Sequence, residues 1–131
     1  MVANGDKKRI MVVDDEPISV RMCEYILKSE GFSVIGTNSG RECLDLLRAQ
    51  NAPNVDLILL DIEMPVLNGF TTLSTIRQTD SLCNIPVIFL TATATPETVQ
   101  AAIKLGVKDY IKKPFDPHEL ISKIKVVLNI E

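Results

Sequence analysis

Short apolar runs alternate along the chain with longer segments in which apolar residues recur every three or four positions. Apolar runs of this length are typical of strands, whereas the longer period is typical of helices with one buried face. The predicted strands are RIMVVD (9–14), FSVIG (32–36), DLILLD (56–61), PVIFLT (86–91) and DYIK (109–112). Three of these runs are apolar throughout rather than alternating, which indicates strands that are buried on both faces.

Five helices are predicted from the segments that follow these strands. The second covers about 40–49 and the third covers 70–78. The apolar positions that mark helical faces are Ile18, Met22, Tyr25 and Ile26; Cys43, Leu44 and Leu47; Val99, Ala102 and Ile103; and Leu120, Ile121, Ile124, Val127 and Leu128.

Several residues mark where these helices begin and end. Pro96 suits the first turn of the fourth helix, and Asp116 and Pro117 suit the N-cap and first position of the fifth. Gly31 and Gly106 stand just past predicted helix ends, where glycine is favoured. The strict alternation therefore predicts an α/β fold, a (βα)5 doubly wound parallel sheet with helices on both faces and right-handed crossovers.

The length and composition fit a single soluble domain. The 131 residues are 46% hydrophobic and 24% charged, as in ordinary globular proteins. We expect an N-terminal extension over 1–8, one domain over 9–131, and no second domain. The runs LILL and VIFL are too short to span a bilayer, and the polar N-terminus lacks a secretory signal. We therefore expect a cytoplasmic protein without a membrane partner.

Charge and cysteine content exclude some classes of function. The net charge of −3 gives no general attraction to nucleic acid, so no nucleic-acid partner is expected for this domain. Cys23, Cys43 and Cys83 lack metal-ligand spacing, and we interpret them as reduced thiols that serve as small core or surface residues.

Charged and hydroxyl side chains gather at the ends of four of the five predicted strands. The second strand is the exception, because it ends in GTNSG. Ligands of an open parallel sheet bind beyond the carboxyl ends of its strands, so these side chains are expected at one edge. They are Asp14 and Asp15 after the first strand, Asp61 after the third, Thr91 after the fourth, and Lys112 and Lys113 after the fifth.

These residue types complement one another chemically. Three carboxylates form a hard-oxygen site of the kind that Mg²⁺ prefers. A lysine and a threonine hydroxyl are donors that suit a phosphoryl group. An aspartate can accept that group as an acyl phosphate, and Asp61 is the best candidate because it is a lone acid after an apolar strand. Asp14 and Asp15 are better suited to the metal.

Four segments, in order and with suitable spacing, match one family. They are VVDDEP, LILLDIEMPVLNGF, VIFLTATAT and DYIKKPF. Over essentially its whole length the chain resembles the receiver domain of two-component response regulators, including chemotaxis regulators. The resemblance implies a flavodoxin-like fold with strand order 2-1-3-4-5. It also implies a signalling module, rather than an enzyme with an external substrate, that takes a phosphoryl group from a histidine kinase or histidine phosphotransfer protein.

The resemblance assigns roles to the acidic residues. Asp61 looks like the phosphoacceptor. Asp15, Asp61 and the backbone carbonyl of Glu63 look like direct ligands of Mg²⁺, for which Mn²⁺ can substitute, and Asp14 acts nearby or through water. Glu16 is instead assigned to the first turn of the following helix, where its charge favours the helix dipole.

The resemblance also assigns the switch. Thr91 resembles the switch hydroxyl, Lys113 the phosphate-pairing lysine, and Tyr110 an aromatic switch that turns inward when Thr91 engages the phosphate. The bond between Lys113 and Pro114 resembles one that is usually cis. Glu63 and Thr93 would flank the phosphoryl group and tune a slow autodephosphorylation, although pairing of Glu63 with Lys113 is left open.

Such a module is expected to signal through a conformational change of one of its surfaces. The surface of the fourth helix, fifth strand and fifth helix would respond to phosphorylation and control an unknown downstream partner. Lys104, Lys108 and Lys112 lie there, and contacts with a partner and a merely solvated basic face are both left open. The chain is expected to be a monomer or a phosphorylation-dependent homodimer.

Two other interpretations of these residues compete with an active receiver. A haloacid-dehalogenase-like phosphatase also uses an aspartate nucleophile, Mg²⁺ and a lysine, but it places a second aspartate where this chain has Glu63. A degenerate receiver that only binds partners is disfavoured because the set of Asp14, Asp15, Asp61, Thr91 and Lys113 is complete. A stand-alone receiver and a piece of a longer regulator or hybrid kinase remain open alternatives.

Overall fold

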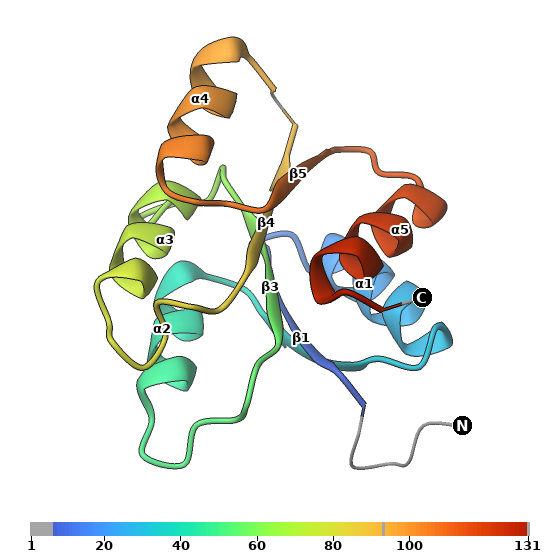
Figure 1. Cartoon of the computed structure of the whole chain (residues 1–131), viewed down its shortest axis with the longest axis horizontal. Helices are drawn as coiled ribbons and strands as arrows, with labels where there is room; N and C mark the ends of the chain where they lie inside the picture. Colours follow the sequence, from blue (N-terminus) through green and yellow to red (C-terminus); the bar gives the residue numbers. More distant parts are fainter. Residues whose placement is uncertain (1–6, 93, 131) are drawn as a thin grey trace.

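A computed structural model describes residues 7–92 and 94–130 as a five-stranded parallel sheet with helices on both faces (Figure 1). The strand order is β2-β1-β3-β4-β5, as predicted. The strands are β1 (Arg9–Val13), β2 (Ser33–Thr37), β3 (Leu57–Asp61), β4 (Val87–Thr91) and β5 (Asp109–Lys112). The helices are α1 (Pro17–Ser29), α2 (Gly40–Arg48), α3 (Gly69–Arg77), α4 (Pro96–Lys104) and α5 (Pro117–Leu128).

The sheet separates two apolar cores. Helices α2, α3 and α4 cover one face, and α1 and α5 cover the other (Figure 1). Successive side chains of a strand point to opposite faces, so Ile58 and Leu60 of β3 enter the first core, whereas Leu57 and Leu59 enter the second. All five residues of β3 and of β4 are buried, which confirms that these apolar runs are strands covered on both faces.

The predicted helix ends are confirmed. The Asp116 carboxylate accepts a hydrogen bond from the His118 N–H at the start of α5, and Pro96 and Pro117 occupy first helical positions. Gly31 and Gly106 follow α1 and α4 with φ of 92° and 76°, a left-handed conformation that a side chain makes costly.

The buried face of α2 was predicted correctly, but that of α1 was not. Cys43, Leu44 and Leu47 of α2 are buried. The residues of α1 that are buried are instead Val20, Cys23 and Leu27. Three of the residues predicted to form one face of this helix are exposed, namely Ile18 (73%), Met22 (50%) and Tyr25 (77%).

The reason is that α1 carries two apolar stripes, and the sheet selects the smaller side chains. Gly36 of β2 lies under Val20, and a Cβ atom added at Gly36 would stand 2.6 Å from Val20 Cγ1. Only a bare backbone at this position lets α1 approach the sheet with Val20 inward. In α4 a similar choice buries Ala102 and leaves Ile103 65% exposed, so the assignment of Ile103 to the buried face was also wrong.

The cysteines are free thiols, as predicted. Cys23 and Cys43 are buried, and burial raises the pKa of each to about 12, so both are neutral and unreactive. Cys83 is half-buried. Across residues 7–92 and 94–130, none of the helices has the length and apolar character needed to cross a membrane.

Candidate functional site

The register of the sheet brings the predicted polar residues to one edge. Val13 of β1 pairs with Leu60 of β3, so the residues that follow, Asp14 and Asp61, are neighbours. On the other side of β3, Asp61 pairs with Leu90, which places Thr91 one residue farther along. Thr91 in turn pairs with Lys112, and its carbonyl accepts a hydrogen bond from the Lys113 N–H at 2.7 Å.

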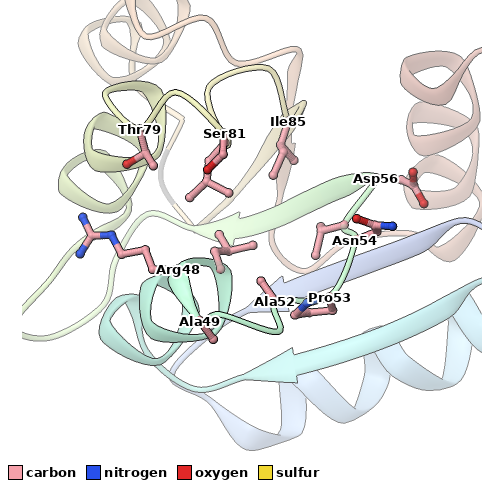
Figure 2. A pocket seen from close by; sticks show the side chains of 12 residues that line it. Arg48, Ala49, Ala52, Pro53, Asn54, Asp56, Thr79, Ser81 and Ile85 are labelled. Carbon is pink, nitrogen blue, oxygen red and sulfur yellow. The ribbon is translucent and has the colours of Figure 1, made fainter.

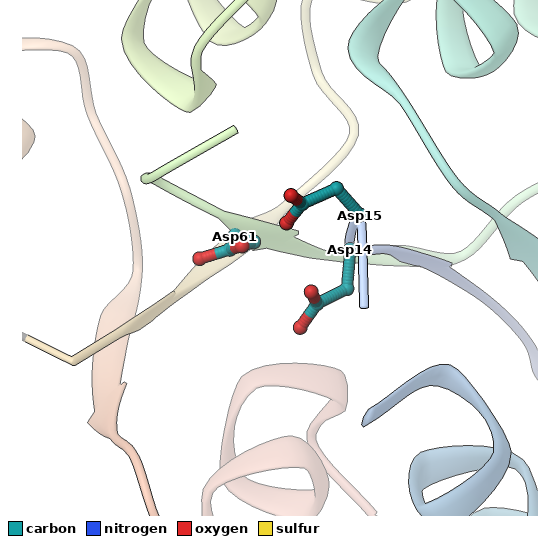
Figure 3. A group of neighbouring side chains, drawn as sticks. All are labelled: Asp14, Asp15 and Asp61. Carbon is teal, nitrogen blue, oxygen red and sulfur yellow. The ribbon is translucent and has the colours of Figure 1, made fainter. Parts of the chain in front are cut away.

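Three carboxylates form the centre of the site. Asp14, Asp15 and Asp61 each offer an oxygen atom, and these atoms lie within 4.8 Å of one another (Figure 3). Asp14 is fully buried and Asp61 is 3% exposed, whereas Asp15 is half-buried. Carboxylates this close repel one another, so the arrangement favours a bound cation or proton.

Lys113 supplies one positive charge to this cluster. Its Nζ atom lies 2.6 Å from Asp14 Oδ2, 3.5 Å from Glu16 Oε1 and 3.6 Å from Asp61 Oδ2. The bond between Lys113 and Pro114 is cis, as the resemblance implied. Burial lowers the pKa of Lys113, but its hydrogen bond to Asp14 and the surrounding carboxylates outweigh burial and raise the pKa, so the ammonium stays charged.

The surroundings of the Asp61 carboxylate oppose its ionisation. Burial raises its pKa, and the negative charge of Asp14 raises it further, to about 7. Lys113 and the hydrogen bond from the Glu63 N–H to Asp61 Oδ1 act in the opposite direction. Positive charge placed beside this carboxylate would favour its ionised form.

Glu16 belongs to the site, contrary to its assignment to a helical turn. It is the N-cap residue of α1, and its side chain makes no capping hydrogen bond. Its carboxylate instead lies beside Lys113, and its N–H donates to Asp14 Oδ1 at 3.0 Å. The prediction for Glu16 rested on its position at the start of a helix. The place of Glu16 as the third consecutive acidic residue after β1 was a signal that it belongs to the acidic site.

Glu63 reaches across to the end of β4. Its Oε1 atom accepts a hydrogen bond from the Ala92 N–H at 3.2 Å. Among the described residues, the carboxylates within 4 Å of the Lys113 ammonium are those of Asp14, Glu16 and Asp61. The alternative in which Glu63 pairs with Lys113 is therefore not the arrangement seen here.

The remaining switch residues lie around this cluster. Thr91 ends β4 and is 2% exposed, beside the strand that carries Asp61. Tyr110 lies on the edge strand β5, where it is 37% exposed, and the Lys123 ammonium is 5.4 Å from the centre of its ring. Thr93, the second residue predicted to tune the phosphoryl lifetime, lies outside the described residues.

A separate hollow of about 600 Å³ lies at the opposite end of the sheet (Figure 2). It is formed by the segments that lead into β3 and β4, with Leu47, Val55 and Leu82 among its apolar lining residues. Within the part of the chain that the structure describes, the acidic cluster that could hold a metal ion lies at the carboxyl ends of the strands, away from this hollow.

Residues 10–125 match the sequence profile of the response regulator receiver domain. The chain belongs to this family. The transcriptional regulatory protein CpxR of Escherichia coli K12 is 38% identical over 120 residues, which are 92% of this chain and 49% of CpxR. The response regulator SaeR of Staphylococcus aureus USA300 is 36% identical over 119 residues, 91% of this chain and 50% of SaeR. This receiver therefore spans about half the length of these curated relatives.

Solved structures show the same fold. The chemotaxis protein CheY4 of Vibrio cholerae superposes with a TM-score of 0.84 at 29% identity, over 92% of this chain and 98% of that one. A putative response regulator of Chloroflexus aurantiacus gives 0.85 at 30% identity, over 94% and 98%. The receiver has the flavodoxin-like fold of these proteins, and the predicted fold class is confirmed.

Proposed function

We propose that this receiver is a phosphorylation switch that accepts a phosphoryl group on Asp61 from the phosphohistidine of a histidine kinase or histidine phosphotransfer protein. The observation that carries the proposal is the buried Asp61 carboxylate, which lies beside two other aspartates and 3.6 Å from the Lys113 ammonium. Membership of the receiver family supports the same reaction class.

The reaction is a transfer between two covalent partners. An Asp61 carboxylate oxygen attacks the phosphorus atom, the bond between phosphorus and the imidazole nitrogen breaks, and an acyl phosphate forms. The imidazole nitrogen leaves with the electron pair of the broken bond. Asp61 attacks as the ionised carboxylate, so the contribution of the protein is to position this group and to compensate its negative charge.

The donor set suits a magnesium ion. Carboxylate and carbonyl oxygens are hard ligands, and Mg²⁺ binds one or two carboxylates while it keeps several waters. Asp15, Asp61 and the backbone carbonyl of Glu63 would hold it directly. Asp14 would act through water, because its two oxygens already accept hydrogen bonds from Glu16 N–H and Lys113. The ion would supply positive charge that offsets the repulsion between these carboxylates and the phosphoryl oxygens; Mn²⁺ has similar oxygen preferences.

Two residues would respond to the new phosphoryl oxygens. Lys113 already lies within reach of Asp61 and would pair with one of them. Thr91 would donate its hydroxyl to another, because β4 lies next to β3 and ends beside Asp61. Movement of Thr91 would let Tyr110 turn inward and change the surface of α4, β5 and α5.

The phosphoryl group would be lost slowly by hydrolysis. A water molecule attacks phosphorus, and Asp61 leaves as a carboxylate. The Glu63 carboxylate accepts a hydrogen bond from the Ala92 N–H at the edge of this site. Glu63 must therefore move before the Ala92 N–H can donate to a phosphoryl oxygen. Glu63 and Thr93 would thus tune access of water and the lifetime of the acyl phosphate.

The wider role follows from the same proposal. The receiver would act in the cytoplasm as a signalling module, as a monomer or a phosphorylation-dependent homodimer. Its exposed Lys104, Lys108 and Lys112 lie on the surface proposed to contact a downstream protein or output domain. The assignment of 1–8 as an extension before a domain over 9–131 stays a prediction.

Incubation with acetyl phosphate and Mg²⁺, followed by intact-mass spectrometry, tests the phosphoacceptor assignment. One phosphoryl group should be added to the unmodified chain and none to Asp61→Asn. Asp56→Asn is a matched control, because it changes the acid at the amino end of the same strand. Addition that persists in Asp61→Asn, or no Mg²⁺-dependent addition to the unmodified chain, would overturn the proposal.

A further inference from the structure

We propose that Lys123 is a positioning residue that holds the Tyr110 ring at the surface and thereby opposes the switch in the unphosphorylated receiver. The inference rests on the proposed function, because it takes Tyr110 to leave this position when Asp61 is phosphorylated. It adds a residue of α5 that acts on Tyr110 without touching the phosphoryl site.

One ammonium contacts both the ring and the main chain of Tyr110. Lys123 Nζ lies 5.4 Å from the centre of the Tyr110 ring, within the range of a cation–π interaction. The same nitrogen donates a hydrogen bond to the Tyr110 carbonyl at 2.8 Å. The side chain of Lys123 therefore connects the middle of α5 to β5 and contacts both the ring and the main chain of Tyr110.

Two carboxylates fix the ammonium over the ring. Asp109 Oδ1 lies 3.4 Å from Lys123 Nζ, and Glu119 Oε2, one helical turn earlier in α5, lies 3.6 Å away. The Lys123 side chain is 28% exposed, so water does not surround it fully. The Tyr110 ring, the Tyr110 carbonyl and these two carboxylates are therefore all within reach of the same ammonium.

Ion pairing alone does not explain this geometry. A lysine that served only to pair with Asp109 and Glu119 at the surface would contribute little and would have no need to reach the Tyr110 carbonyl. Contact with the ammonium stabilises the present rotamer of Tyr110, because that contact is lost when the ring turns away. Its loss at an exposed site corresponds to about a two- to fivefold change in a conformational equilibrium.

Lys123→Met tests the inference, and Lys125→Met is its matched control. Both changes remove one positive charge from α5, but Lys125 pairs with Glu30 of the α1 end at 3.6 Å instead of contacting Tyr110. Lys123→Arg keeps a cation that favours aromatic rings. The position of the Tyr110 ring is read from ¹⁹F NMR of fluorotyrosine-labelled protein, in a Tyr25→Phe background that leaves Tyr110 as the single tyrosine.

Lys123→Met should shift the Tyr110 signal of the untreated protein and tighten binding of beryllofluoride with Mg²⁺, a stable mimic of the phosphoryl group, by about two- to fivefold. Lys123→Arg and Lys125→Met should both stay close to the parent. In a Tyr110→Ala background, Lys123→Met should no longer change beryllofluoride binding, because the ring it acts on is absent.

Three results would overturn the inference. They are an unchanged Tyr110 signal in Lys123→Met, an equal effect of Lys125→Met, and an effect of Lys123→Met that survives in Tyr110→Ala. Absence of a beryllofluoride response in every variant would instead contradict the proposed function and the switch with it. The signal of the untreated protein would then still decide whether Lys123 holds the ring.

Discussion

Acidic residues at the amino and carboxyl ends of β1 and β3 differ in hydrogen bonding and in burial. At the amino end, Asp56 accepts a hydrogen bond from the Arg9 N–H at 2.8 Å, and the Asp56 N–H donates to the Arg9 carbonyl at 2.8 Å. The Asp56 side chain remains partly exposed to water. At the carboxyl end, Asp14 and Asp61 are buried beside each other. At the amino end of this pair of strands the acidic residue is therefore hydrogen-bonded to the neighbouring main chain, whereas the carboxyl end carries excess negative charge.

This difference separates a structural carboxylate from a functional one. Three carboxylates, those of Asp14, Glu16 and Asp61, lie within 4 Å of the Lys113 ammonium, and Asp15 adds a further carboxylate beside Asp14 and Asp61. Groups arranged in this way lower the stability of the empty site and raise its affinity for added positive charge. Asp56 has no such excess, so changes there should affect folding alone. Four experiments test this comparison.

Asp15→Ala should have the largest effect. It removes the half-buried carboxylate proposed to bind Mg²⁺, and phosphorylation by acetyl phosphate should slow on the order of 1,000-fold. The fold should be retained, because Asp15 lies beyond the end of β1 and outside the two cores. Time courses of intact mass and calorimetric titration with Mg²⁺ measure the two effects. Phosphorylation at the parent rate would show that the acidic motif has been misread.

Lys113→Met should mainly reduce stability. It leaves Asp14 and Asp61 buried without their cation, and the free energy of unfolding should fall by about 3 kcal/mol. Urea denaturation without Mg²⁺ measures this. Lys112→Met, at an exposed neighbouring position, should change stability by less than about 0.5 kcal/mol. Equal losses in the two variants would contradict the assigned role of the Lys113 ammonium.

Stability should depend on pH through Asp61. Its pKa is raised from 3.8 to about 7, so between these values the folded state holds a proton that the unfolded state has lost. The resulting stability is complete below the unfolded pKa and is lost as the pH rises through 7. From pH 5 to 8 the free energy of unfolding should fall by about 3 kcal/mol more in the parent than in Asp61→Asn. Parallel curves for the two proteins would refute this.

Asp56→Ala should have the smallest effect. It removes one hydrogen bond at the satisfied end of the sheet, at a cost of about 1 kcal/mol. The cost should be the same with and without Mg²⁺, and phosphorylation should keep its parent rate. A Mg²⁺-dependent change in stability on this substitution would remove the contrast between the two ends.

The sequence was sufficient where local pattern and tertiary environment agree. The apolar run of β3 predicts a strand buried on both faces, and the sheet between two helical layers removes all of LILL from water. Asp116 and Pro117 fix the start of α5 through a side-chain acceptor and a preset φ, both of which act within a few residues. The positions of Asp14, Asp61 and Lys113 at one edge followed from parallel strands.

The sequence was insufficient where two arrangements satisfy the same pattern. In α1 both Ile18–Met22–Tyr25 and Val20–Cys23–Leu27 have helical spacing, and packing against the sheet, including the close approach of Val20 to Gly36, selects the second. The contacts of Lys123 with Tyr110, and of Glu63 with Ala92, join residues 13 and 29 positions apart. No local signal encodes such pairs.

The amino-acid sequence by itself determined the order of elements, the parallel sheet and the residue types at its carboxyl edge, because hydrophobic period and chain direction suffice for these. Tertiary structure alone decided which side chains share the Lys113 ammonium and how far burial raises the pKa of Asp61. Both depend on distances and on exclusion of water, which exist only once the strands and helices have packed.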